Sequence, residues 1–219
     1  MCFPQLSNVV NVIRKSSSAI FLIILALAAQ GISAPHRQSE VSSEEYAVYS
    51  ALLRQRRVPE GITLIVIEDH TQTTEFLYDD DLSGHLKYVK RRLPSFSQVA
   101  FNDFRAKNRE SQTLNRSFNL KLRYSLLSRA KFESFAGPGG TMEMSEAGWQ
   151  RFYSEYRGSS GLLSFSRVGF DHKKNQALVF ISDIRGHSSG RQWGDGSYVL
   201  LIKKARRWRV QGRVGIMVS

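Results

Sequence analysis

Apolar side chains recur at helical spacing in the first part of the sequence. Ser42-x-x-Glu45 has the spacing of a capping box, in which two side chains satisfy free amides at a helix start. Tyr46, Tyr49 and Leu53 follow on one helical face. The pattern predicts a helix that begins at Ser42 and ends by residue 58.

Two further amphipathic segments follow. Asp79-Asp-Asp81 precedes Leu82, and anionic residues favour a helix start, so we expect a short helix to Arg92. Ser95-x-x-Gln98 opens a second helix that should end near Asn108. Its apolar side carries Phe96, Val99, Ala100 and Phe104.

Two strands are predicted before residue 130, one on each side of these helices. Residues 62–67 form a short β-branched run that is typical of a buried strand. Glu68-Asp69-His70 follows it directly, so its polar exit is a candidate site. Residues 118–124 alternate apolar and polar side chains, the period of a half-buried strand.

An aromatic stripe marks the next helix. Trp149, Phe152, Tyr153 and Tyr156 share one helical face, and we interpret this face as core rather than as a ligand platform.

The last part of the chain is rich in strand-forming residues. Four segments are separated by short turns and predict an antiparallel meander: 162–170, 176–184, 197–204 and 207–214. Helices followed by a meander predict an α+β fold, with N-terminal helices and a strand packed on a C-terminal antiparallel four-strand meander. A curved sheet wrapped by helices resembles the nuclear-transport-factor-2-like folds in architecture, which transfers no function.

The first 34 residues have the order of a secretory signal peptide. Arg14 and Lys15 precede an apolar run at 19–29, and small residues follow up to Ala34. The 11-residue run is shorter than the roughly 20 residues of a membrane-spanning helix. We therefore expect a cleaved signal and a secreted or periplasmic protein; the alternative is an N-terminal membrane anchor. Residues 35–43 would form a flexible leader and 44–219 a single α+β domain.

Net charge and cysteine content limit the classes of partner that the protein is expected to bind. The net charge is +12, and removing residues 1–34 leaves 29 basic and 19 acidic residues, a net charge of +10. Such a field favours anionic partners, such as an acidic glycan or a membrane surface, and export argues against nucleic acid. The only cysteine, Cys2, lies in the signal, so we expect no disulfide-linked partner.

Several motifs carry a more specific resemblance. They are Tyr49-Ser-Ala-Leu-Leu53, Asp103-Phe-x-x-Lys107-Asn108, Trp149-x-x-Phe152-Tyr153-x-x-Tyr156, Ser166-Arg-Val-Gly-Phe170, Gln176-Ala-Leu-Val179 and Gly196-x-Tyr198-Val-Leu-Leu-x-Lys203. With these the chain resembles a family of uncharacterised exported bacterial proteins with no established activity. The resemblance implies export and a domain over Glu45–Ser219, but no catalytic residue. The turn at 186–196 departs from the family pattern.

Polar residues on apolar strands form the first candidate ligand site. If the strands alternate regularly, Arg167 and Asp183 point to the apolar side and can meet. Asp69 at the first strand's exit and His187 in the 186–196 turn complete this site. The alternative is a structural ion pair near the sheet edge, or two strand ends that reach water.

Neither catalysis nor metal binding is predicted. The 186–196 turn holds the residue types of a serine hydrolase, but no Gly-x-Ser-x-Gly elbow is present. The histidines lack the i, i+2 or i, i+4 pairing of a local zinc site. We therefore assign no catalytic residue, no metal and no cofactor.

Basic clusters at 54–57, 87–92 and 203–209 form the second candidate site. If they converge, they make an anion patch with Trp208 available for stacking; otherwise each is a solvated turn. The patch residues are Arg56, Arg57, Lys203, Lys204, Arg206 and Arg207.

Three functional hypotheses result. The leading one is an exported, non-catalytic binding or interaction domain. The alternatives are a small-ligand binder or enzyme with a pocket on the curved sheet, and a protein whose basic surface binds acidic glycan or membrane.

Overall fold

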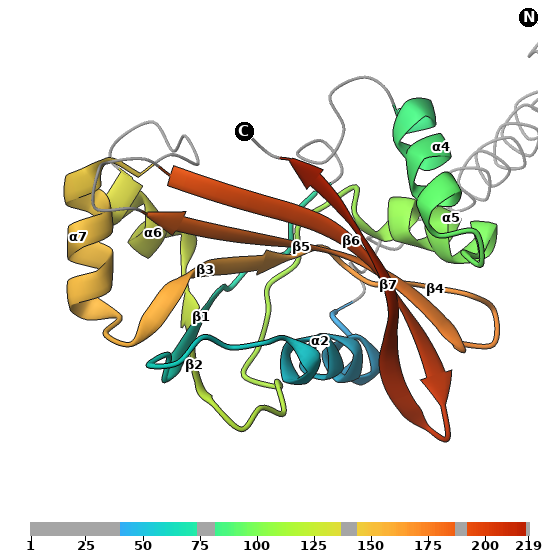
Figure 1. Cartoon of the computed structure of the whole chain (residues 1–219), viewed down its shortest axis with the longest axis horizontal. Helices are drawn as coiled ribbons and strands as arrows, with labels where there is room; N and C mark the ends of the chain where they lie inside the picture. Colours follow the sequence, from blue (N-terminus) through green and yellow to red (C-terminus); the bar gives the residue numbers. More distant parts are fainter. Residues whose placement is uncertain (1–39, 74–81, 137–143, 187–191, 218–219) are drawn as a thin grey trace, which may run out of the picture. The chain divides into compact units, whose positions relative to one another are not determined.

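A mixed sheet lies at the centre of the described chain (Figure 1). The computed structural model describes residues 40–73, 82–136, 144–186 and 192–217. The helices are α2 (Ser43–Gln55), α4 (Leu82–Arg92), α5 (Gln98–Lys107), α6 (Arg129–Ala136) and α7 (Glu146–Glu155). The strands are β1 (Leu64–Glu68), β2 (Arg123–Leu127), β3 (Ser159–Phe165), β4 (Gly169–Phe170), β5 (Gln176–Gly186), β6 (Gln192–Lys204) and β7 (Arg207–Met217).

The sheet combines a parallel part with an antiparallel part. Its order is β2-β1-β3-β5-β6-β7, and the short β4 also pairs with β5. β1 pairs in parallel with both β2 and β3, whereas β3, β5, β6 and β7 form an antiparallel meander. The α+β class and the meander are confirmed, but the sheet has seven strands because β1, β2 and β4 join it.

Helices cover both faces of this sheet. Helix α2 packs on the face that carries Val179, Ile181 and Val199. Helices α4 and α5 pack on the opposite face around Phe180 and Tyr198. Helices α6 and α7 cover another part of that opposite face. Within the described ranges, no helix is long and apolar enough to cross a membrane.

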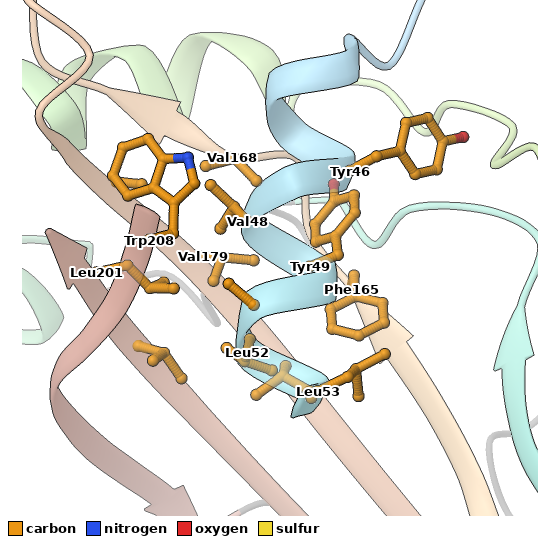
Figure 2. Packing of buried hydrophobic residues seen from close by; sticks show 14 of the residues in the cluster. Tyr46, Val48, Tyr49, Leu52, Leu53, Phe165, Val168, Val179, Leu201 and Trp208 are labelled. Carbon is orange, nitrogen blue, oxygen red and sulfur yellow. The ribbon is translucent and has the colours of Figure 1, made fainter. Parts of the chain in front are cut away.

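Helix α2 begins as the sequence predicts. Ser42 Oγ accepts from the Glu45 amide at 3.4 Å, and the Glu45 carboxylate accepts from the Ser42 amide at 2.9 Å, which completes the capping box. Tyr49 and Leu52 are buried against the sheet (Figure 2). Figure 2 also shows Trp208 and Phe165 on different sides of this helix.

Helix α5 begins two residues later than predicted. Ser97, not Ser95, is its N-cap, and Phe101 replaces Val99 among its fully buried side chains. The helix lies directly on β4, where a Cβ atom at Gly169 would stand 2.2 Å from the Ala100 carbonyl oxygen. Only glycine allows this close approach.

The predicted strand at 118–124 is wrong, because the strand is β2 at Arg123–Leu127. Phe118 is buried as predicted, but it packs against α2 from a loop. The loop's backbone bonds to side chains of that helix: the Asn119 amide donates to Ser50 Oγ at 2.9 Å, and Arg54 donates to the Asn119 carbonyl at 3.0 Å. The alternating apolar and polar residues at 118–124 therefore reflect a loop that packs on a helix rather than a strand that pairs in a sheet.

The predicted strand at 162–170 is interrupted at 166–168, between β3 and β4. At this break Ser166 Oγ accepts from the Phe180 amide at 2.8 Å and replaces a backbone partner. Tyr49 donates to the Ser166 carbonyl at 2.9 Å from α2. The break turns Arg167 away from the regular strand geometry on which its predicted contact with Asp183 depended.

Helix α7 confirms the aromatic stripe as core. Trp149 and Phe152 are fully buried, and Tyr153 stacks on Trp149 with ring centroids 5.5 Å apart. Helix α6, which the sequence analysis missed, packs against α7 through Phe135.

Candidate functional site

Arg167 pairs with Glu45 of α2 and not with Asp183. Arg167 Nε and Nη2 donate to the Glu45 carboxylate at 2.7 and 3.0 Å, and the Val168 amide donates to it at 3.2 Å. The two side chains are 3% and 1% exposed. Burial alone would raise the pKa of Glu45, but the hydrogen bonds from Arg167 and Ser42 lower it overall. The ion pair is buried within the fold, but its acidic partner is Glu45 and not Asp183, so the predicted pair of Arg167 with Asp183 does not form.

The motif residues of α5 support the same break in the sheet. Asn108 Oδ1 accepts from the Arg167 amide at 2.6 Å, and its Nδ2 donates to the Arg167 carbonyl at 3.1 Å. Lys107 donates to the Val168 carbonyl, and Asp103 accepts from the Phe170 amide. The side chains of Asp103, Lys107 and Asn108 thus hold the backbone of residues 167–170, which gives them a structural role.

Asp183 lies in a cavity of about 440 Å³ on the α2 face of the sheet. Its Oδ2 accepts from Arg56 and Arg185, and Oδ1, which is buried, has no partner. Asp195 stands directly opposite in the β5–β6 register. Asp183 is therefore the centre of a local charge cluster, and the predicted site with Arg167 does not form.

Asp69 lies apart from both Arg167 and Asp183. It lines a cavity of about 320 Å³ at the carboxyl end of β1, which we call the β1-exit cavity. Asp69 contacts the adjacent His70, which is half exposed. His187, the fourth residue of the predicted ligand site, lies outside the described residues. The structure therefore does not bring Asp69 together with Arg167 or Asp183.

The three basic clusters do not all converge on one surface, although 54–57 and 203–209 meet in part. Residues 87–92 belong to α4, on the sheet face opposite α2. Lys203 donates to Glu44 at 2.7 Å, and Arg56 is held by Asp183. Of the predicted patch, Arg56 and Arg57 line the Asp183 cavity, whereas Arg206 and Arg207 line another. Lys204 is exposed at the end of β6.

Trp208 is not available for stacking. It is 6% exposed, packs on Phe170 and donates its indole N–H to Glu44 at 2.6 Å. Although burial opposes it, hydrogen bonds from Lys203 and Trp208 lower the pKa of Glu44. Trp208 and Glu44 therefore anchor the start of β7 to α2.

A groove of about 540 Å³ lies between α2 and the start of β7. We call it the arginine groove, because among the described residues its lining has no acidic side chain and four arginines: Arg54, Arg206, Arg207 and Arg209. All four are exposed, and in the described part of the chain the side chains of Arg206, Arg207 and Arg209 make no ion pair or hydrogen bond. Like charges that are left together without counterions attract an anionic ligand.

The groove has a fixed frame. Gln55 of α2 accepts from the Val210 amide at 3.1 Å and donates to the Trp208 carbonyl at 3.4 Å, so it pairs with the edge strand β7 as a peptide group would. Ala205 and Arg206 form the two-residue turn between β6 and β7 with φ of 47° and 61°. Both values lie in the left-handed region, which non-glycine residues rarely adopt.

Sequence reasoning missed three residues of these sites. Arg54 and Arg209 belong to the basic clusters but were not placed in the patch, because their proximity depends on how α2 docks beside β7. Glu68 belonged to the noted polar exit, but only the fold shows its surroundings. Burial, with some repulsion from Asp69, raises its pKa to about 7.

Comparisons add no relative, since no family model, curated protein or solved structure matches this chain. Among the described residues, no three histidine, cysteine, aspartate or glutamate side chains are close enough to hold a metal ion.

Proposed function

We propose that this protein is an exported, non-catalytic binding domain that holds an acidic glycan in the arginine groove. The observation that carries the proposal is the groove itself, with four exposed arginines and no acidic residue in its lining. Carboxylate and sulfate groups accept paired hydrogen bonds from guanidinium groups, which favours arginine at such sites. The signal-like N-terminus and the net charge of +12 support the same function.

A glycan chain suits this site better than a membrane surface. The arginines come from two elements, α2 and the β6–β7 hairpin, with a hollow between them. A single polymer strand that carries repeated negative groups can enter this hollow and contact both walls. A flat bilayer can reach only the outermost side chains.

The test measures binding to heparin, with dextran as an uncharged control. We expect the triple variant Arg206→Ser, Arg207→Ser and Arg209→Ser to bind roughly tenfold or more weakly, because it removes several charge-assisted contacts. Increasing salt should weaken the wild type strongly and the variant less.

A matched variant separates the groove from the general positive charge. Lys87→Ser, Lys90→Ser and Arg91→Ser remove the same charge from exposed positions of α4 on the other sheet face. Equal losses in the two triple variants would mean that net charge alone attracts heparin. Binding to anionic vesicles that exceeds binding to heparin would favour the membrane alternative.

A further inference from the structure

The β1-exit cavity is a second site, lined by different residues from the arginine groove. β1 lies between two parallel neighbours, β2 and β3, so the chain leaves the sheet here beside the end of β2. The cavity of about 320 Å³ is walled by residues 68–73, by Ser111 and by the beginning of α6. A space of this size accommodates a small organic molecule.

The walls of this cavity are fixed by backbone hydrogen bonds on both sides. The Asp69 amide donates to the Leu127 carbonyl at 2.9 Å, and the Thr71 amide donates to the Gln112 carbonyl at 2.8 Å. On the other side, the Gln72 amide donates to the Phe165 carbonyl at 2.8 Å. The segment after β1 is therefore a rigid wall of the cavity.

Most charged groups of the cavity already have partners. Asp69 contacts His70, and Arg129 Nε of α6 donates to Glu133 at 3.1 Å. Glu68 is the exception, because no described side chain or backbone group forms a hydrogen bond or ion pair with its carboxylate. Among the described lining residues, the cavity thus holds one carboxylate whose oxygens accept no hydrogen bond.

Gln72 supplies a second, independent acceptor. It lines the cavity and is 7% exposed, and its Nε2 donates to Ser164 Oγ at 2.8 Å. Its buried Oε1 accepts no hydrogen bond. A buried polar atom without a partner is costly, which a ligand with a donor group at this position would relieve.

We propose that the β1-exit cavity binds a small organic amine as its ammonium form, paired with Glu68, with a second donor group for Gln72 and an apolar body against Phe132. Both unused groups of the cavity accept hydrogen bonds, whereas its one arginine is already paired. An anionic ligand would meet the carboxylates of Glu68, Asp69 and Glu133 instead. The ring of Phe132 is partly exposed and offers an apolar surface to the ligand.

The protonation of Glu68 gives this site a distinctive pH dependence. Burial and the charge of Asp69 raise the pKa of Glu68 to about 7, although Arg129 lowers it in part. Below pH 7 the carboxyl is therefore mostly protonated, and an ammonium ligand must displace this proton. Affinity should therefore fall roughly tenfold for each pH unit below 7. His70 and Glu133 also line the cavity, so a His70→Gln variant is needed to show that this slope belongs to Glu68.

The experiment titrates the full chain with 5-amino-1-pentanol and follows backbone amide resonances by NMR. The neutral control ligand is 1,5-pentanediol, which has the same length and lacks the ammonium group. We expect shifts at residues 68–73 and 127–133 with the amine, at least tenfold weaker binding of the diol, and the same loss for the amine in Glu68→Gln. The matched control Glu146→Gln removes a surface carboxylate on α7 and should keep wild-type affinity.

Three results would overturn the proposal. They are equal affinity for amine and diol, unchanged amine affinity in a folded Glu68→Gln protein, and wild-type affinity that does not change between pH 5 and 8. The pH series on the wild type and on His70→Gln needs no Glu68 variant, so it tests the proposal even if Glu68→Gln does not fold. A fourth such result would be displacement of the amine by calcium chloride, which would assign the carboxylates to a metal ion instead.

Discussion

Two strongly charged regions flank the same helix, α2, and they are built in opposite ways. On one side Glu45 and Arg167 are buried together, and the Glu45 carboxylate accepts hydrogen bonds from Arg167, Val168 and Ser42. On the other side the arginines of the arginine groove are exposed, and the side chains of three of the four form no hydrogen bond or ion pair with a described residue.

The difference shows which charges maintain the fold and which are open to a ligand. A buried charge must be paired, because removing it from water is costly, so Glu45 and Arg167 are explained by stability alone. Exposed like charges that stand together gain nothing from the fold. Their arrangement is the basis of the binding function proposed above.

The largest expected effect comes from breaking the buried pair. Arg167→Met leaves the Glu45 carboxylate buried without its main partner and should cost about 3–5 kcal/mol of unfolding free energy, measured by urea denaturation. The exposed pair Arg129–Glu133 is the control, and Arg129→Met should cost less than about 1 kcal/mol. If both variants lost similar stability, the distinction between the two regions would be wrong.

The double variant Glu45→Leu with Arg167→Met sharpens this test. It removes both charges and should recover part of the loss, because two apolar groups can replace a buried ion pair. If the losses of the two single variants, Glu45→Leu and Arg167→Met, simply added in the double variant, the two side chains would stabilise the fold independently of each other.

A change of pH should have an intermediate effect on stability, and the effect should have opposite signs for the paired carboxyl of Glu45 and the unpaired carboxyl of Glu68. The pKa of Glu45 is lower in the folded protein than the value of about 4.5 for an unpaired carboxyl. The stability that its charge contributes is therefore complete above about pH 4.5, and it is lost as the pH falls through the lowered pKa of the folded protein. The pKa of Glu68 is raised to about 7, so stability falls as pH rises from about 4.5 to 7.

Glu68→Gln isolates the second of these two contributions. Its stability relative to wild type should increase between pH 5 and pH 8 by about 1–3 kcal/mol, since partial exposure of Glu68 reduces the full effect. Urea denaturation at the two pH values measures this change. A constant difference would show that Glu68 ionises normally.

The sequence predicted what depends on local pattern. The capping box at Ser42, the aromatic stripe of α7 and the meander depend on spacing within one segment, and all three are confirmed. The segment at 118–124 failed because an alternating pattern can also fit a loop that packs on a helix.

The sites depended on contacts between distant segments, which no local pattern contains. Arg167 and Glu45 are 122 positions apart, and a break in the strand sets which partner Arg167 meets. The arginine groove likewise requires α2 to lie beside β7, an edge strand whose position follows from the whole sheet order. Composition predicted an anion-binding surface but could not say which of the basic clusters forms it.

The smallest expected effect concerns the turn that carries Arg206. Ala205 and Arg206 hold positive φ values that a two-residue hairpin turn requires and that asparagine and glycine adopt more readily. Replacing them by Ala205→Asn and Arg206→Gly should stabilise the fold by about 1 kcal/mol and weaken heparin binding, because it relieves backbone strain and removes one arginine from the groove.

The single variant Ala205→Asn separates these two consequences. It keeps Arg206 and should raise stability without loss of heparin affinity, which urea denaturation and a binding titration measure on the same sample. If the double variant binds heparin as well as Ala205→Asn does, Arg206 is not a ligand contact. The strained turn would then have no functional explanation, and heparin binding in the arginine groove would depend on Arg54, Arg207 and Arg209 alone.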